Sequence, residues 1–168
     1  LYAGCGYGGS CFPKDVKGLI NTSVEKGYIP RILSMVDEVN ETQKMVIIDK
    51  IINRFGSDLS DLTFAIWGLA FKPQTDDVRC APSITIISEL LKRGAKVKAY
   101  DSKAMETFKK EVESDNIEYV NSKYDVLDDS DALILITEWK EFRSLDLDEL
   151  SKRLKRKRLQ KHQRKQWK

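Results

Sequence analysis

The residues best suited to chemistry lie near the start of the chain, where Cys11 is followed by Pro13, Lys14 and Asp15. Proline suits the first turn of a helix, because its missing N–H would have no partner there. A thiol just before a helix lies near free N–H groups and the positive end of the helix dipole, and Lys14 adds a positive charge. This setting favours a thiolate and predicts that Cys11 is a nucleophile. Asp15 is expected to act as a base or to orient a water or a lysine.

A glycine-rich segment precedes this cysteine. Gly4, Gly6 and Gly9 match the G-x-G-x-x-G spacing of dinucleotide-binding turns. That fingerprint needs a strand directly before it, and only three residues precede Gly4 here. The alternatives are a flexible turn, or a segment whose missing side chains let the backbone approach a ligand closely. The neighbouring Cys11 favours the approach to a ligand.

The other two cysteines, Cys5 and Cys80, lack the setting of a helix start. We expect both to be small, buried apolar side chains. A sparse, odd set of cysteines does not indicate a disulfide framework and is typical of a reducing compartment. The sequence therefore predicts a cytoplasmic protein.

Two helices are expected to position the cysteine. The first runs from about residue 13 to 26 and ends at Gly27, a natural C-terminal cap. The second begins at Pro30 and keeps roughly helical apolar spacing until Gly56. A helix this long is unusual in a small domain. It either connects domains, packs against a partner chain, or lies on its own core.

Strands and helices alternate after Gly56. Unbroken apolar strands between helices predict a parallel sheet covered on both faces. The expected strands are 62–69, 97–100, 117–120 and 132–137, and the expected helices are 83–93, 104–112 and 147–154, with a short turn or helix at 124–129. We therefore predict an α/β fold, a small Rossmann-like doubly wound domain over residues 57–150.

Composition excludes several classes of protein. With 41% hydrophobic and 33% charged residues, the chain is expected to fold rather than to be disordered. Its longest apolar run, 132–136, is far shorter than the roughly 20 residues of a membrane helix. The net charge of +3 is an average: residues 151–168 hold ten Lys and Arg and no acid, which leaves 19 basic and 26 acidic residues, a net charge of −7, in 1–150. We therefore expect no membrane and no specific nucleic-acid partner, although the tail could bind polyanions non-specifically.

Two ordered motifs carry a family resemblance. One is GYGGSCFPKD at residues 6–15, and the other is GLAFKPQTDDVR at 68–79, followed by APS at 81–83. With both motifs the chain resembles the UDP-glucose 6-dehydrogenases, within the wider UDP-glucose/GDP-mannose dehydrogenase family. Tyr7 and Phe12 favour the UDP-glucose branch, and a relative of the GDP-mannose type is the alternative.

The resemblance implies a reaction and roles for residues. Such enzymes oxidise the C6 alcohol of UDP-glucose to a carboxylate with two NAD⁺, through a cysteine thioester and without a metal. Cys11 would be the nucleophile, Asp15 would position or activate the hydrolytic water, and Lys14 would belong to the same catalytic set. Arg79 would approach NAD, although taken alone it would pair with Asp76 or Asp77. The residues beside the nicotinamide would be Cys11, Phe12, Pro13 and Lys14.

The resemblance also implies a substrate site and a dimer. Lys72 would pair with the charge of UDP-glucose, although taken alone it would be a solvated loop lysine. The helix over 30–56 would connect domains and form a homodimer. The substrate-binding residues would be Tyr2, Gly4, Gly6, Tyr7, Gly8, Phe71 and Lys72.

The chain departs from the family in three places. We expect the family's first half, which carries the NAD-binding domain, to be missing, and Tyr2 stands where relatives carry lysine. Past Leu154 the family continues into a strand and an Asp-Gly-Arg motif, which the basic tail lacks. We therefore expect a cysteine segment at 1–29, a connecting helix at 30–56, a UDP-binding domain at 57–150, and a divergent tail at 151–168. Such a chain would be inactive alone, and the alternative is a non-catalytic UDP-sugar-binding or dimerisation module.

Overall fold

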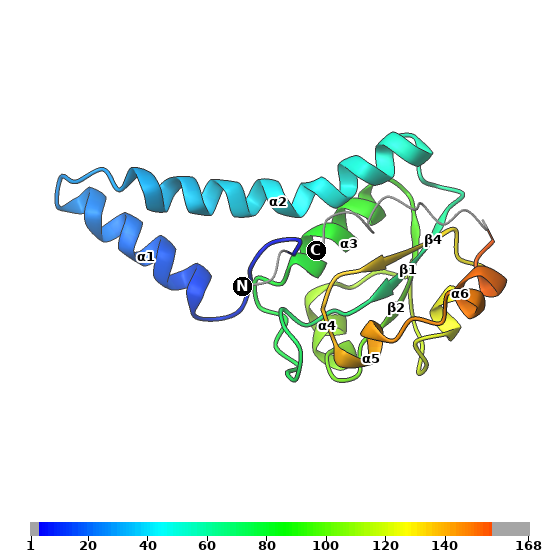
Figure 1. Cartoon of the computed structure of the whole chain (residues 1–168). Helices are drawn as coiled ribbons and strands as arrows, with labels where there is room; N and C mark the ends of the chain where they lie inside the picture. Colours follow the sequence, from blue (N-terminus) through cyan, green and yellow to red (C-terminus); the bar gives the residue numbers. More distant parts are fainter. Residues whose placement is uncertain (1–3, 156–168) are drawn as a thin grey trace, which may run out of the picture.

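A helical arm projects from an α/β body in the computed structural model, which describes residues 4–155 (Figure 1). The arm is a hairpin of α1 (Phe12–Glu25) and α2 (Arg31–Phe55), and the far end of α2 packs on the body. Both helices lie where the sequence predicts them. Within residues 4–155, no helix combines the length and the apolar character needed to span a membrane.

The body contains a four-stranded parallel sheet with the order β3-β2-β1-β4. Its strands are β1 (Thr63–Trp67), β2 (Lys96–Tyr100), β3 (Ile117–Tyr119) and β4 (Ala132–Leu135). The chain first winds from β1 to β2 and β3, and then returns to place β4 on the other side of β1. This reversal confirms the predicted doubly wound α/β fold. In such sheets ligands bind beyond the carboxyl ends of the strands, where the order reverses.

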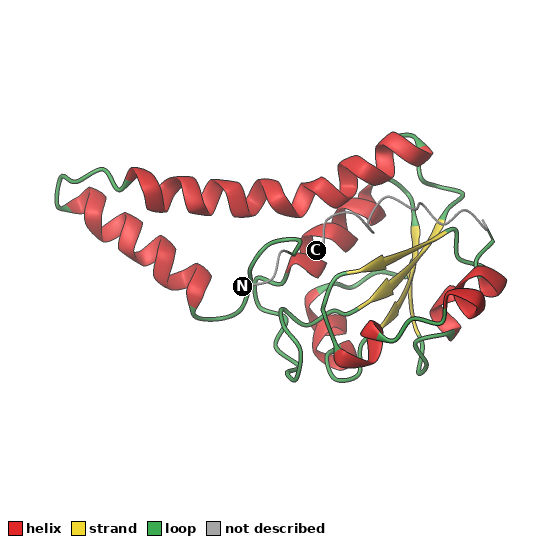
Figure 2. Ribbon diagram, in the orientation of Figure 1, coloured by secondary structure: helices red, strands yellow, loops and turns green. Residues whose placement is uncertain are grey.

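Helices cover both faces of the sheet (Figure 2). On one face Phe64 and Ile66 share a core with α2, α3 (Pro82–Lys92) and α4 (Met105–Glu111). On the other face Ala65 and Trp67 share a core with η1 (Asp125–Leu127), α5 (Lys140–Arg143) and α6 (Leu147–Arg153). The alternation follows from the two-residue period of a strand, because successive side chains point to opposite faces.

The short helix α5 was not expected from the sequence. Its four residues contain one apolar side chain, Phe142, so no helical period can be recognised in them. Phe142 is buried and stacks on the ring of Trp67, with 5.0 Å between the ring centroids. The helix therefore forms because the tertiary core accepts this one ring.

Candidate functional site

A large groove lies where the glycine segment, α2 and the carboxyl ends of β1 and β4 meet. Its volume is about 1670 Å³, and it is lined by residues 4–7, one side of α2, Phe71, and the residues that follow β4. This is the edge of the sheet at which the strand order reverses, so the fold places the groove where doubly wound proteins bind ligands.

The glycine segment is held against α2 by side-chain amides. The N–H of Tyr7 donates to Oδ1 of Asn40 over 2.7 Å, and Nδ2 of Asn40 donates to the carbonyl of Tyr7 over 3.2 Å. Nε2 of Gln43 donates to the carbonyl of Gly4 over 2.8 Å. Nothing in the sequence points to Asn40 or Gln43, because neither belongs to a recognised motif.

The other side of the glycine segment packs against the loop before α3. The N–H of Gly9 donates to the carbonyl of Arg79 over 2.8 Å. A Cβ on Gly8 would overlap the carbonyl of Cys80, and one on Gly9 would lie 2.7 Å from the ring of Phe71. Glycine is therefore needed at these two positions so that the chain's own backbone and the ring of Phe71 can pack there. The expected close approach of the glycine segment to a ligand stays a prediction.

Cys11 lies at the N-terminal end of α1, and its side chain is exposed. Its Sγ lies 3.6 Å from Oγ of Ser10. The N–H of Asp15 donates to the carbonyl of Cys11 over 2.8 Å, and residues four apart share one face of a helix. Asp15 forms an exposed ion pair of 2.7 Å with Lys14, and this hydrogen bond raises the pKa of Lys14. A thiol, a carboxylate and an ammonium thus share the first turns of one helix.

The second predicted motif presents its charges around the same segment. Lys72 is exposed, and its Nζ lies 5.1 Å from the ring centroid of Phe71. Arg79 pairs with Asp77, with 2.8 Å between Nη2 and Oδ2. This hydrogen bond lowers the pKa of Asp77 and raises that of Arg79, to which Cys11 adds a smaller electrostatic contribution. Of the two partners that the sequence left open for Arg79, the structure selects Asp77.

The prediction that Cys80 is buried is wrong. Its side chain is exposed, and its backbone φ is 53°, in the left-handed region. The tight turn there buries Ala81 instead and turns the carbonyl of Cys80 toward Gly8. Cys5 does pack against the core, and burial raises the pKa of its thiol to about 11.

Asp101 is a buried carboxylate that organises the loop carrying Phe71. Its Oδ2 accepts from the N–H groups of Leu69 and Ala70, over 2.7 and 3.1 Å, and from Nε1 of Trp139 over 3.1 Å. Its Oδ1 accepts from the N–H groups of two residues that follow it, Lys103 and Ala104. The position of an acidic residue directly after a predicted strand is a sequence signal that could have identified Asp101.

Several predictions fall elsewhere. Tyr2 and residues 156–168 of the basic tail lie outside the described residues. Within residues 4–155, His, Cys, Asp and Glu form no group of three or more that could hold a metal ion.

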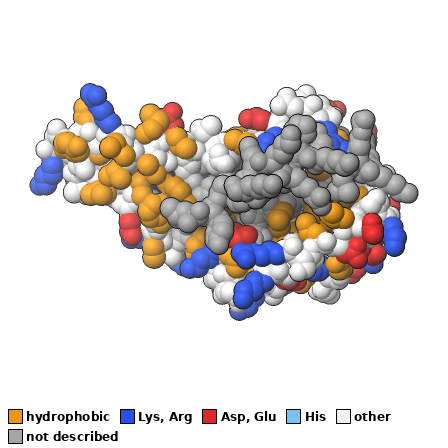
Figure 3. Space-filling view, in the orientation of Figure 1, with side chains coloured by type: hydrophobic (Ala, Val, Ile, Leu, Met, Phe, Trp, Pro, Cys, Tyr) orange, Lys and Arg blue, Asp and Glu red, His pale blue; other side chains and the backbone are white. Residues whose placement is uncertain are grey.

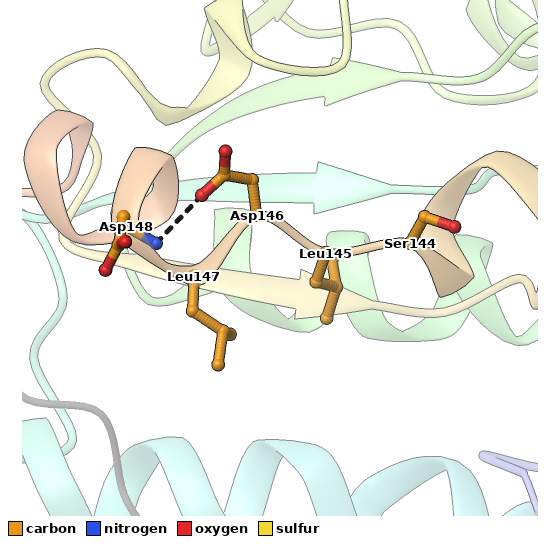
Figure 4. A pocket seen from close by; sticks show the side chains of 5 residues that line it. All are labelled: Ser144, Leu145, Asp146, Leu147 and Asp148. Atoms are coloured by element: carbon orange, nitrogen blue, oxygen red, sulfur yellow. Dashed lines mark hydrogen bonds between the residues drawn. The ribbon is translucent and has the colours of Figure 1, made fainter.

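A second, shallow hollow lies at residues 144–148, where Figure 4 shows the carboxylate of Asp146 accepting from the N–H of Asp148. That carboxylate caps α6, so the hollow offers no comparable chemistry.

Known proteins of one family match the chain along most of its length. The UDP binding domain of the UDP-glucose/GDP-mannose dehydrogenase family matches residues 65–163, and the central domain of that family matches residues 1–42. The UDP-glucose 6-dehydrogenase of Pseudomonas aeruginosa is 41% identical over 154 residues, which cover 89% of this chain and 34% of that protein. The corresponding protein of Haloferax volcanii is 42% identical over 146 residues, covering 87% of this chain and 33% of the relative.

A solved structure gives the same result. A UDP-glucose dehydrogenase from Pyrobaculum islandicum superimposes with a TM-score of 0.80 at 36% identity, covering 86% of this chain and 33% of that one. The chain thus spans about a third of the length of the relatives that it matches. Because the matched family domain covers more than half of its residues, the chain belongs to the UDP-glucose/GDP-mannose dehydrogenase family.

Proposed function

We propose that the chain is the C-terminal part of a cytoplasmic, NAD-dependent UDP-glucose 6-dehydrogenase, and that it turns over only together with an N-terminal nucleotide-binding part. The observation that carries this proposal is the exposed Cys11 at a helix start, one turn from Asp15 and next to Phe12, whose ring contacts Tyr7 in the lining of the groove. The proposed parts are a cysteine segment at 1–29, a connecting helix at 30–56, a UDP-binding domain at 57–150, and a tail at 151–168.

The groove supports binding of a nucleotide sugar. The ring of Phe71 offers an apolar wall of the groove, and the exposed ammonium of Lys72 beside that ring suits a diphosphate. Gly4, Gly6 and Tyr7 line the same groove, and the missing side chains of the two glycines let a sugar approach the backbone there. We assign Gly8 to the support of this segment, because it packs on the chain's own backbone.

Cys11 and Asp15 support oxidation beyond the aldehyde. The thiolate of Cys11 adds to the aldehyde carbon, and the thiohemiacetal then loses a hydride to become a thioester. Water attacks the thioester carbon, the C–S bond breaks, and Cys11 regains its thiolate as the acid loses its proton. Asp15, on the same face of α1 and paired with Lys14, holds that water and accepts its proton.

The residues on this chain fit one edge of an anionic dinucleotide. Arg79 offers an exposed guanidinium for a phosphate, and Phe12 offers an exposed ring beside Cys11. The turn after β1, at residues 68–81, lacks a G-x-G-x-x-G sequence, so most of an NAD site must come from elsewhere. When bound, NAD supplies the hydride acceptor for both oxidation steps.

The helical arm supports a homodimer. Apolar side chains gather on the face of the arm shown in Figure 3. Ile32 is 80% exposed, and single exposed apolar residues are normal whereas a contiguous group indicates an interface. The large apolar side chains exposed on the arm are Phe12, Leu19, Val24, Tyr28, Ile29, Ile32, Met35, Val36 and Val39. Of these, Ile32, Met35, Val36 and Val39 also line the groove, so the other five are the ones available for a dimer contact alone.

The test is reconstitution of turnover. The chain is mixed with the N-terminal two thirds of the Pseudomonas aeruginosa relative, and NADH formation is followed with UDP-glucose or GDP-mannose. We expect turnover with UDP-glucose only, and its complete loss in Cys11→Ala, whereas Cys80→Ala keeps it. UDP-glucose binding without any turnover of the mixture would favour a non-catalytic binding module instead, and turnover with GDP-mannose would favour the other branch of the family.

A further inference from the structure

The buried face of α2 changes character along the helix. Its members are Asn40, Lys44, Ile48 and Ile51, which lie on one side because of their spacing. Ile48 and Ile51 pack in the core, whereas the two polar members lie where the helix meets the glycine segment. Asparagine is a poor helix former and costly to bury, so a 5% exposed Asn40 within a helix indicates that its amide has a role.

The side-chain amide of Asn40 forms two hydrogen bonds with the backbone of Tyr7, as a paired residue of a neighbouring strand does. It accepts from the N–H of Tyr7 over 2.7 Å and donates to the carbonyl of the same residue over 3.2 Å. The donor at Tyr7 N fixes which end of the amide is oxygen. Only glycine fits before Tyr7, because a Cβ on Gly6 would lie 3.0 Å from Oδ1 of Asn40 at a φ of +116°.

We call the two hydrogen bonds between Asn40 and Tyr7 the amide clamp. One ring contact connects the clamped residue to the neighbour of Cys11. The ring of Tyr7 contacts the ring of Phe12 edge to face, with 4.7 Å between the centroids. Phe12 is the first residue of α1 and follows Cys11. A shift of Tyr7 would therefore move both the wall of the groove and the start of the helix that carries the thiol.

We propose that Asn40 is a positioning residue, which fixes the main chain of Tyr7 and through it the placement of Cys11 and of the substrate-binding glycine segment. The clamp itself follows from the contacts above, whereas its use for a nucleotide sugar rests on the proposed function. Tyr7 lies between two glycines, whose backbone freedom makes an unclamped segment open easily. An amide clamp on the main chain of Tyr7 offsets that freedom.

The test compares Asn40→Asp with Asn53→Asp, the same substitution at an exposed position of the same helix. A carboxylate at position 40 still accepts from the N–H of Tyr7, but it loses the donor to the carbonyl of Tyr7 and repels that carbonyl, which opens the pair. Position 53 leaves the segment untouched. At pH 7 we expect the Tyr7 amide to exchange with deuterium about tenfold faster in Asn40→Asp, the size of a lost buried hydrogen bond. Affinity for UDP-glucose should fall by a similar factor in calorimetry, while exchange in β1 and α3 stays unchanged.

Acid rescue separates positioning from a general loss of structure. A protonated carboxyl can donate to the Tyr7 carbonyl again, so the ratio of exchange rates between the two variants should approach one as pH falls toward about 4. A ratio of one at pH 7, or faster exchange with unchanged affinity, would overturn the proposal. If Asn40→Asp does not fold, Asn40→Ser removes the clamp without adding charge. If the unsubstituted chain binds no UDP-glucose, the proposed function fails, while exchange at Tyr7 still decides whether the clamp exists.

Discussion

Replacing Asp101 by Asn tests how the loop that carries Phe71 and Lys72 is held. The carboxylate is fully buried and accepts five N–H groups, three on Oδ2 and two on Oδ1. In Asp101→Asn one oxygen becomes an NH₂ group, which donates instead of accepting. The least costly orientation places this group at the Oδ1 position, so the buried N–H of Ala104 and the partly buried N–H of Lys103 lose their acceptor.

The expected loss of stability follows from this count. The unsatisfied buried N–H of Ala104 costs about 1–3 kcal/mol, that of Lys103 costs less because water can reach it, and the three remaining bonds lose their charge assistance, about 1 kcal/mol each. The relief of carboxylate burial offsets part of this, which leaves a net loss of about 4 kcal/mol. A domain is stable by only about 5–15 kcal/mol, so the effect is large.

Urea denaturation followed by circular dichroism measures this loss. The matched control is Asp49→Asn, the same change at an exposed position of α2, for which we expect a change within about 0.5 kcal/mol. If Asp101→Asn costs less than about 1 kcal/mol, or no more than the control, the five bonds do not hold the loop and the reasoning is refuted.

Two further predictions concern the reactivity of the three cysteines and the stability of variants in the glycine segment. Iodoacetamide at pH 8 should label the exposed Cys11 and Cys80 first, while Cys5 reacts only as the pH approaches 11, because burial raises its pKa to about 11. The labelled peptides are identified by mass spectrometry. Labelling of Cys5 at pH 8 as fast as that of Cys80 would contradict the prediction. Gly8→Ala should lower the unfolding free energy by about 1–3 kcal/mol through overlap with the carbonyl of Cys80, whereas Gly4→Ala, which meets no atom within 4 Å, should not. Equal thermal unfolding midpoints for these two variants would argue against the close contact at Gly8.

The sequence alone determined the elements whose signals are local. The apolar run of β4 and the stop at Gly56 depend on neighbours in the chain, so strands, helices and the doubly wound fold could be predicted. The place of Cys11 at a helix start could be predicted for the same reason, since Pro13 marks the beginning of the helix beside it. The short helix α5 could not be predicted, because one apolar residue in four carries no period.

Only the tertiary structure decided what holds the site together. Asn40 meets Tyr7 across 33 positions of sequence, and Asp101 meets Leu69 across 32. Cys80 was expected to be buried and is exposed, because the turn before α3 buries Ala81 in its place. A hydrogen bond between distant residues leaves no periodic trace in the chain, since its partners are set by how the elements pack. The sequence therefore determined which groups could react, and the packing of α2 and the sheet determined how they are held.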